Sequence, residues 1–154
     1  RRRQREGADC HDGYLIKEAE EQGGTVIGLA SAGEQLEAMN RLPLDFHIRN
    51  LSSAAQYGDN VEDAMETTIA LYLQGEIGMI MPALRKIVPD SLSKEDYDLF
   101  QKVLLTDRNH IMAQRAAPVL ATGDAFIAVG ALHLPGEDGL VELLRAQGYR
   151  LTAM

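Results

Sequence analysis

Cysteine is almost absent from this sequence, because Cys10 is the only one among its 154 residues. A single thiol cannot form a disulfide within the chain, and it cannot supply a cysteine cluster for a metal ion. No apolar run approaches the roughly 18 residues that a transmembrane helix needs. These absences argue against a disulfide-stapled fold, a cysteine-based metal centre and a membrane-spanning helix within the printed sequence.

Positive charge is also scarce. Fifteen basic residues stand against 23 acidic ones, which gives a formal net charge of −8. This balance repels phosphate backbones and anionic lipids, so nucleic acid is not an expected partner. The one basic run, Arg1 to Arg3 with Arg5, is short and terminal, and we interpret it as a solvated tail.

Common catalytic motifs are missing as well. The sequence contains no HExxH, CxxC, P-loop or GxSxG pattern. Without a nucleophile elbow, a serine-nucleophile hydrolase is not expected. Cys10 and His11 could suggest a thiol and its base, but adjacent side chains rarely face one another, and we set this pair aside.

Short apolar runs lie near both ends of the chain. Residues 25–29 and 125–129 are continuous apolar or β-branched segments next to glycine, which is typical of buried strands, and residues 149–154 could add a last strand. We therefore predict an α/β fold with a short central sheet built from strands near both ends. The missing initiator Met suggests the C-terminal part of a larger single domain.

The middle of the chain, at about 44–121, is predicted to be mostly helical. Val61, Met65, Ile69 and Tyr72 repeat at intervals of four, four and three, which marks one amphipathic helix. Further helices are expected after Asp12, after the capping patterns Ser31–Glu34 and Ser93–Asp96, between Pro82 and Pro89, from Asp107 towards Gly123, and from Leu140 to Gly148.

His133 is the leading candidate site residue, since it follows the apolar run 125–129 by a Gly-Ala-Leu turn. Ligands bind at the carboxyl ends of strands in open α/β sheets. A neutral imidazole can accept a proton or give a lone pair to a divalent metal near neutral pH. The alternative interpretation is a loop histidine that bonds to a backbone carbonyl, and spacing alone leaves both open.

Arg108 is the second candidate, within Asp107-Arg108-Asn109 at the start of a predicted helix. A guanidinium is always charged and donates in a fixed fork, so it could clamp a carboxylate or polarise a carbonyl. It could equally pair with a surface acid.

The remaining polar candidates have simpler interpretations. His11, His47 and His110 have no partner at a recognised ligand spacing, so we expect them to be structural or exposed. Glu34 and Glu37 fall three apart on one predicted helix, where a solvated face explains them better than a pair of catalytic carboxylates.

Three features in order resemble the C-terminal half of the TraB/GumN family, which is related to Tiki proteases, PrgY pheromone-shutdown proteins and, more distantly, ChaN and erythromycin esterases. The first is the segment through Leu29 followed by a helix at Glu34. The second is Asp107-Arg108-Asn109 ahead of Met112. The third is the stretch 126–136, Phe-Ile-Ala-Val-Gly-Ala-Leu-His-Leu-Pro-Gly, with Gly139-Leu140 and Gly148-Tyr149 behind it. The resemblance spans nearly the whole chain.

The family's site is thought to combine two Gly-x-x-His motifs, an acidic residue and an arginine. The resemblance implies that Gly130 and His133 form the second motif and that Arg108 is the arginine, with Gly130 and Asn109 contacting substrate. No other Gly-x-x-His occurs here, so the first motif is expected in a missing N-terminal half. Ala30 stands where many GumN-type members have Glu, which leaves no carboxylate at that position.

The resemblance implies metal-assisted hydrolysis of a peptide or related amide, with Arg108 and His133 as catalytic residues and His133 as a ligand of manganese, cobalt or zinc. One alternative is a binding protein for haem or another small molecule, as the ChaN resemblance permits. Another is a regulatory protein that kept the fold. The bacterial periplasm or envelope is the implied location.

Overall fold

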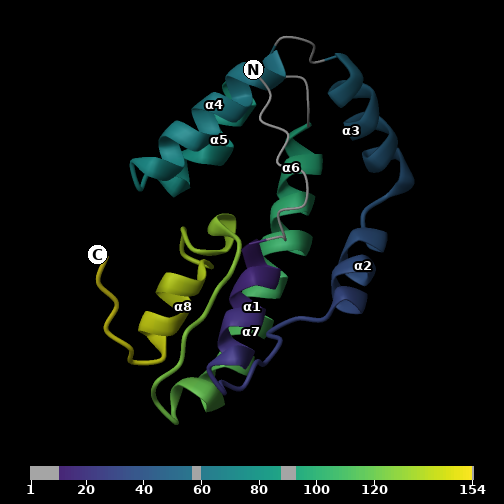
Figure 1. Cartoon of the computed structure of the whole chain (residues 1–154). Coiled ribbons are helices and arrows are strands. Elements are labelled where there is room, and N and C mark those ends of the chain that lie inside the picture. The colour runs from purple at the N-terminus through teal and green to yellow at the C-terminus, as the bar shows by residue number, and fades with distance from the viewer. Residues whose placement is uncertain (1–10, 57–59, 88–92, 154) are drawn as a thin grey trace.

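The computed structural model describes residues 11–56, 60–87 and 93–153 of the chain, and these residues are built from helices and connecting segments (Figure 1). The elements, in chain order, are α1 (His11–Glu21), α2 (Ala32–Asn40), α3 (Leu44–Gln56), α4 (Asn60–Leu73), η1 (Ile77–Met79), α5 (Ile80–Ile87), α6 (Lys94–Phe100), η2 (Gln101–Thr106), α7 (Asp107–Leu120), η3 (Ala131–His133) and α8 (Leu140–Ala146).

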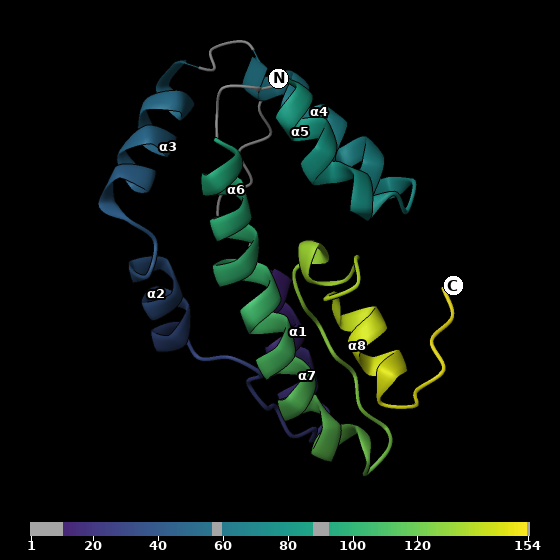
Figure 2. The ribbon, with the colours of Figure 1, turned by 180° about the vertical axis from the view of Figure 1, so that it is seen from behind.

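One long helical rod organises the rest of the molecule. It consists of α6, the π-helical segment η2 and α7, and the backbone stays in the right-handed helical region across both junctions. Figures 1 and 2 show α2 and α3 along one side of this rod, α4 and α5 near one end, and η3 with α8 on the other side. Helix α8 packs on α7, and α2 packs on η2.

The predicted capping residues are confirmed. Ser31 accepts a hydrogen bond from the N–H of Glu34 at 3.2 Å, while the Glu34 carboxylate accepts one from the N–H of Ser31 at 2.7 Å. Ser93 likewise accepts from the N–H of Asp96 at 3.1 Å. Each cap satisfies donors that the first helical turn leaves unpaired, so the sequence pattern fixes these helix starts.

The predicted sheet is wrong, because the described part of the chain contains no strand. Residues 25–29 and 125–129 run as connecting segments without a backbone hydrogen bond to another described segment. Side chains within them are open to solvent, with Phe126 80% exposed. Apolar and β-branched residues favour an extended backbone, but a strand also needs a neighbouring backbone to pair with. Residues 149–153 form no strand either, and Met154 lies outside the described residues.

Two apolar clusters hold the helices together. The first joins α2 and α3 to the rod through Ala38, Leu42, Phe46 and Val103. The second joins α7 to α8 through Met112, Ala113 and Leu140, and Leu29 and Val129 pack against it. The segments predicted as strands are therefore anchored by their last residues, which fixes the start of the turn that carries His133.

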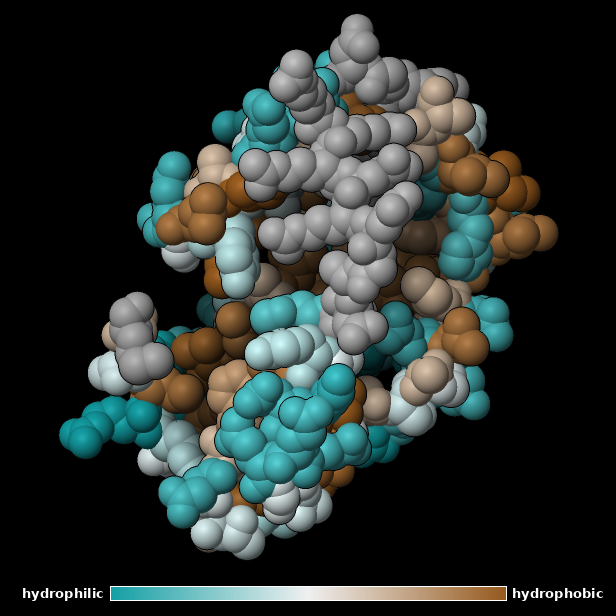
Figure 3. Space-filling view, in the orientation of Figure 1, coloured by the Kyte–Doolittle hydropathy of each residue, from teal (hydrophilic) through white to brown (hydrophobic). Residues whose placement is uncertain are grey.

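Apolar side chains on α3 and α4 remain on the surface. Leu51 and Leu73 are 75% and 77% exposed, and Figure 3 shows brown hydrophobic side chains along the outer edge over α3. Among the described residues, no helix combines the length and the apolar character needed to cross a membrane.

Candidate functional site

His133 lies in a tight turn at the end of segment 125–129. The N–H of His133 donates to the Gly130 carbonyl at 2.9 Å and closes the single turn η3. The side chain is half-buried, and Val129 of the preceding segment packs into the cluster around Met112. The imidazole is thus held against the rod.

Asn109 fixes the ring of His133. Oδ1 of Asn109 lies 2.6 Å from Nδ1 of His133, and Nδ2 of Asn109 donates to the Asp138 carbonyl at 2.7 Å. Asn109 is only 3% exposed. A chain of hydrogen bonds therefore runs from the loop at Asp138, through a buried amide of α7, to the imidazole.

The loop that supplies the Asp138 carbonyl is itself held against α7. Nε2 of His110 lies 3.1 Å from Oδ1 of Asp138. Two consecutive residues of α7, Asn109 and His110, therefore both contact Asp138. At the next position, a Cβ on Gly139 would lie 2.3 Å from the carbonyl oxygens of Leu134 and Pro135. Only glycine allows so close a backbone approach.

Arg108 lies in the first turn of the same helix, one residue before Asn109. The carboxylate of its neighbour Asp107 pairs with other cations, since it accepts hydrogen bonds from Arg41 at 3.0 Å and from Lys102 at 2.6 Å. No salt bridge or hydrogen bond joins Arg108 to another residue in the described ranges. Burial, and then the positive charge of Arg108, lower the pKa of His133 below its ordinary value of 6.5. The imidazole is therefore neutral at neutral pH.

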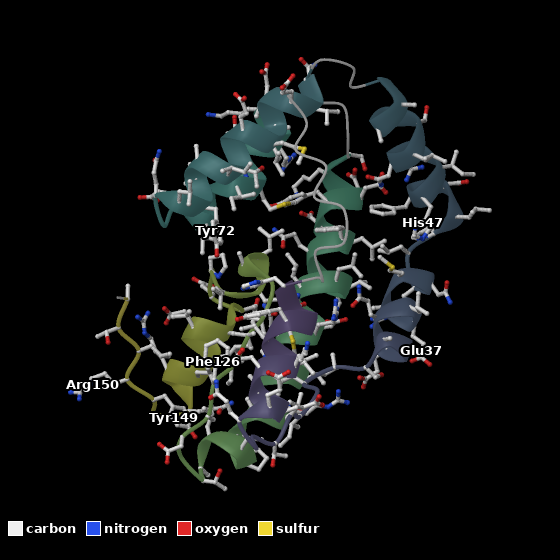
Figure 4. The ribbon with its side chains drawn as sticks, viewed as in Figure 1. Glu37, His47, Tyr72, Phe126, Tyr149 and Arg150 are labelled. Carbon is white, nitrogen blue, oxygen red and sulfur yellow. The ribbon has the colours of Figure 1, made fainter. Side chains whose placement is uncertain are left out.

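Arg108 and His133 share a pocket of about 580 Å³. It forms where α2, α4, α5, the rod and the η3 turn meet, and Figure 4 labels Tyr72 above this turn. The side chains and backbone that line it belong to Gln35, Met39, Thr68, Ile69, Tyr72, Ile80, Leu84, Leu104, Leu105, Arg108, Gly130, Ala131, Leu132 and His133. Among the described residues that line it, most are apolar and none is acidic, so Arg108 gives this part of the wall a positive charge.

A smaller pocket of about 210 Å³ also touches Arg108. Ala30, Glu34 and Glu37 line it together with Asp107. The acidic side chains near Arg108 therefore come from α2 and Asp107, whereas position 30 contributes only a methyl group. The sequence predicted a helix cap at Glu34 and a solvated face for Glu34 and Glu37, and it did not predict that both line a pocket with Arg108.

Glu34 joins α2 to the rod. Arg115 donates to both carboxylate oxygens of Glu34, at 2.9 and 2.5 Å, and to the Leu29 carbonyl at 2.9 Å. The bond to Arg115 is the main reason that the pKa of Glu34 falls to about 2, and the N–H of Ser31 adds to the effect. Sequence reasoning identified the capping role of Glu34 but missed this link, because nothing in the spacing pairs residues 81 apart.

A family model described as the TraB/PrgY/gumN family matches residues 1–153. The chain belongs to this family. Comparisons with curated proteins and with solved structures find no match. Membership in the TraB/PrgY/gumN family confirms the resemblance drawn from segments 25–36, 107–113 and 126–149.

The residues predicted to form the family's site lie together in one place. Arg108, Gly130 and His133 line the larger pocket, while Asn109 lies behind His133 rather than in the pocket wall. The other described histidines are elsewhere. Nε2 of His47 contacts the Met39 carbonyl at 3.2 Å on the outer side of the molecule (Figure 4), and His110 contacts Asp138.

The described residues do not by themselves supply enough ligands for the metal ion that a TraB/PrgY/gumN resemblance implies. His133 is the one His, Cys, Asp or Glu in the lining of the larger pocket, and the described ranges hold no cluster of three such side chains. Zinc sites of hydrolases use about three protein ligands. Manganese, cobalt or zinc at His133 stays a prediction that needs further donor groups.

Proposed function

We propose that this TraB/PrgY/gumN-family chain contributes to a hydrolytic site for a peptide or related amide. His133 would act as the general base, and Arg108 would stabilise negative charge. One observation carries the proposal, namely that the same pocket is lined by a neutral imidazole and by a guanidinium that pairs with no acid in the described part of the chain. The mostly apolar lining would weaken the screening of charge by solvent and so strengthen the effect of Arg108.

In the proposed reaction, the oxygen of a water molecule bonds to the carbonyl carbon, and the water gives a proton to Nε2 of His133. The carbonyl oxygen takes up the negative charge, and the Arg108 guanidinium donates to it. When the carbon–nitrogen bond breaks, the imidazolium returns the proton to the leaving nitrogen. His133 is then neutral again, and no step passes through a metal ion.

The pKa of His133 sets the acidic limit of this reaction. A base works only while unprotonated, so turnover should fall as pH drops through the pKa of His133, which lies below 6.5. Arg108→Gln removes the nearby cation, and the pKa of His133 should rise. The acidic limb of kcat/KM against pH would then move to higher pH, and an unmoved limb would contradict the assigned base.

The direct test is the hydrolysis of a quenched-fluorescent peptide library by the purified chain, with and without added manganese, cobalt or zinc. His133→Ala should lower turnover by about 100-fold or more, which is typical of the loss of a general base. His47→Ala is the matched control, because His47 lies on the outside of α3, and it should leave turnover unchanged. Equal turnover by the two variants would refute the proposal.

The mostly apolar pocket supports a second candidate, non-catalytic binding of haem or a similar ligand. Its volume of about 580 Å³ is in the range of small-molecule sites. Nε2 of His133 could ligate iron, and Arg108 could pair with a carboxylate of the ligand. Titration with haem should then give a Soret band that His133→Ala abolishes and His47→Ala preserves.

A further inference from the structure

We propose that Asn109 is a positioning residue that locks His133 in the tautomer with hydrogen on Nδ1 and the lone pair on Nε2. The lock on the tautomer follows from the hydrogen bonds alone. Its value for catalysis rests on the proposed function above. This role differs from the substrate contact expected for Asn109 from the sequence.

The first step is the orientation of the Asn109 amide. Its side chain lies 2.7 Å from the Asp138 carbonyl oxygen, which can only accept a hydrogen bond. The amide group that faces this oxygen must therefore be the NH2. It follows that Oδ1 faces the opposite way, towards His133.

The second step is the protonation of the imidazole. Oδ1 of Asn109 can only accept, and it lies 2.6 Å from Nδ1 of His133. Nδ1 must therefore carry the hydrogen. In a neutral ring the lone pair is then on Nε2, the nitrogen that a base or a metal ligand would use.

The third step is the rigidity of the amide. Asn109 is 3% exposed, and its oxygen and nitrogen both have protein partners. Rotation of the amide by 180° would therefore bring Oδ1 of Asn109 face to face with the carbonyl oxygen of Asp138, and two acceptors repel one another. The Asp138 carbonyl cannot move away easily, because His110 holds the Asp138 side chain and Gly139 packs against the carbonyls of Leu134 and Pro135. Rotation would leave the Asp138 carbonyl without its donor, and the cost of an unsatisfied polar group opposes the rotated amide.

The same contacts leave Asn109 with little capacity to hold a substrate. The residue lines neither the larger nor the smaller pocket, and its polar atoms point to the loop and to His133. Its position next to Arg108 has a different consequence. One turn of α7 presents the guanidinium to the pocket and orients the imidazole that faces it.

The test is the two-bond ¹⁵N–¹H spectrum of the imidazole rings in the unmodified chain at a pH above the ordinary pKa of histidine. His133, assigned by its loss in His133→Gln, should show a protonated Nδ1 and an unprotonated Nε2. A protonated Nε2, or averaged shifts on the two nitrogens, would overturn the proposal without any variant of Asn109.

Variants then measure what the lock contributes. Asn109→Leu removes the acceptor and should give averaged nitrogen shifts, whereas Asn109→Asp keeps an acceptor and should keep hydrogen on Nδ1 while its negative charge raises the pKa of His133. Asn50→Leu is the matched control, because Asn50 donates to the Phe46 carbonyl on α3, remote from the pocket. It should leave the His133 signals unchanged, and a change equal to that of Asn109→Leu would refute a specific lock.

Turnover of the peptide library separates this inference from the proposed function. Asn109→Leu should lower kcat by about 10- to 100-fold with little change in KM, as expected for a group that orients a histidine. If the unmodified chain hydrolyses no peptide but Nδ1 carries the hydrogen, the lock stands and the hydrolase proposal fails. If turnover depends on His133 but Nε2 carries the hydrogen, the lock fails alone.

Discussion

The region from α7 to the end of the described chain differs sharply from the region of α3 and α4. In the first, residues 107–153, the polar groups of Asn109 and Asp138 pair with one another around an apolar cluster. In the second, residues 44–56 and 60–73, apolar side chains such as Leu51 and Leu73 face solvent. Both regions contain amphipathic helices. The difference teaches that periodicity defines which face of a helix is apolar, whereas long-range contacts decide whether that face is buried.

The largest effect should come from cutting the link between α3 and the rod. Phe46 is 5% exposed and packs with Leu42 and Val103, so Phe46→Ala should cost about 3–5 kcal/mol of unfolding free energy. Urea unfolding measures the loss. The exposed Leu44→Ala is the control and should cost far less; a similar loss in both variants would mean that Phe46 does not anchor α3.

The next effect should come from the loop behind His133. Gly139→Ala places a methyl group against two backbone carbonyls, which should cost about 1–3 kcal/mol and disturb the bond between Asn109 and Asp138. At Gly130 an added Cβ would lie 3.6 Å from the His133 ring, an ordinary contact, and φ is −59°. Thermal unfolding should therefore separate Gly139→Ala from a nearly neutral Gly130→Ala, and equal melting temperatures would contradict the close packing at Gly139.

A smaller effect should follow from Arg115→Met, which frees Glu34 and the Leu29 carbonyl. The pKa of Glu34, now about 2, should rise towards 4.5. A lowered carboxylate pKa contributes stability that is present above pH 4.5 and is lost as pH falls towards 2. The variant should lose this part of the pH dependence of unfolding. Arg145→Met is the control, because Arg145 pairs with Glu142 within α8, and it should keep the dependence.

The smallest effect should come from the exposed apolar faces. Leu51→Gln and Leu73→Gln should each change the unfolding free energy by less than about 0.5 kcal/mol, since neither side chain is covered in the structure. Urea unfolding again provides the measurement. A cost of several kcal/mol for either variant would show that these faces are buried in solution and would remove the contrast between the two regions.

Local chemistry made the helices predictable. Ser31, Ser93 and Gly148 define helix ends through hydrogen bonds to residues a few positions away. A short sequence pattern is therefore enough to predict these ends. The sheet could not be derived in the same way. The apolar runs at 25–29 and 125–129 predicted strands, but pairing depends on a second backbone that no local pattern supplies.

The candidate site was predictable in its main residues and not in its connections. The sequence motifs indicate Arg108 and His133, and the structure brings both to one pocket. The bond between Asn109 and His133 joins positions 24 apart, and the bond from Asn109 to Asp138 joins positions 29 apart. Such contacts depend on how α8 and its loop pack against α7, which is a tertiary event.

The π-helical segment η2 has a consequence for where Arg108 points. An α-helix turns by about 100° per residue, and a π turn accommodates an additional residue without breaking the helix. If Gln101 to Thr106 were wound as a regular α-helix with every residue kept, the additional residue would turn the faces of α7 by about that angle relative to α6. Arg108 would then lose its alignment with His133, although every helix could remain. The π turn therefore sets the angular phase between the half of the rod that carries α3 and the half that carries the site.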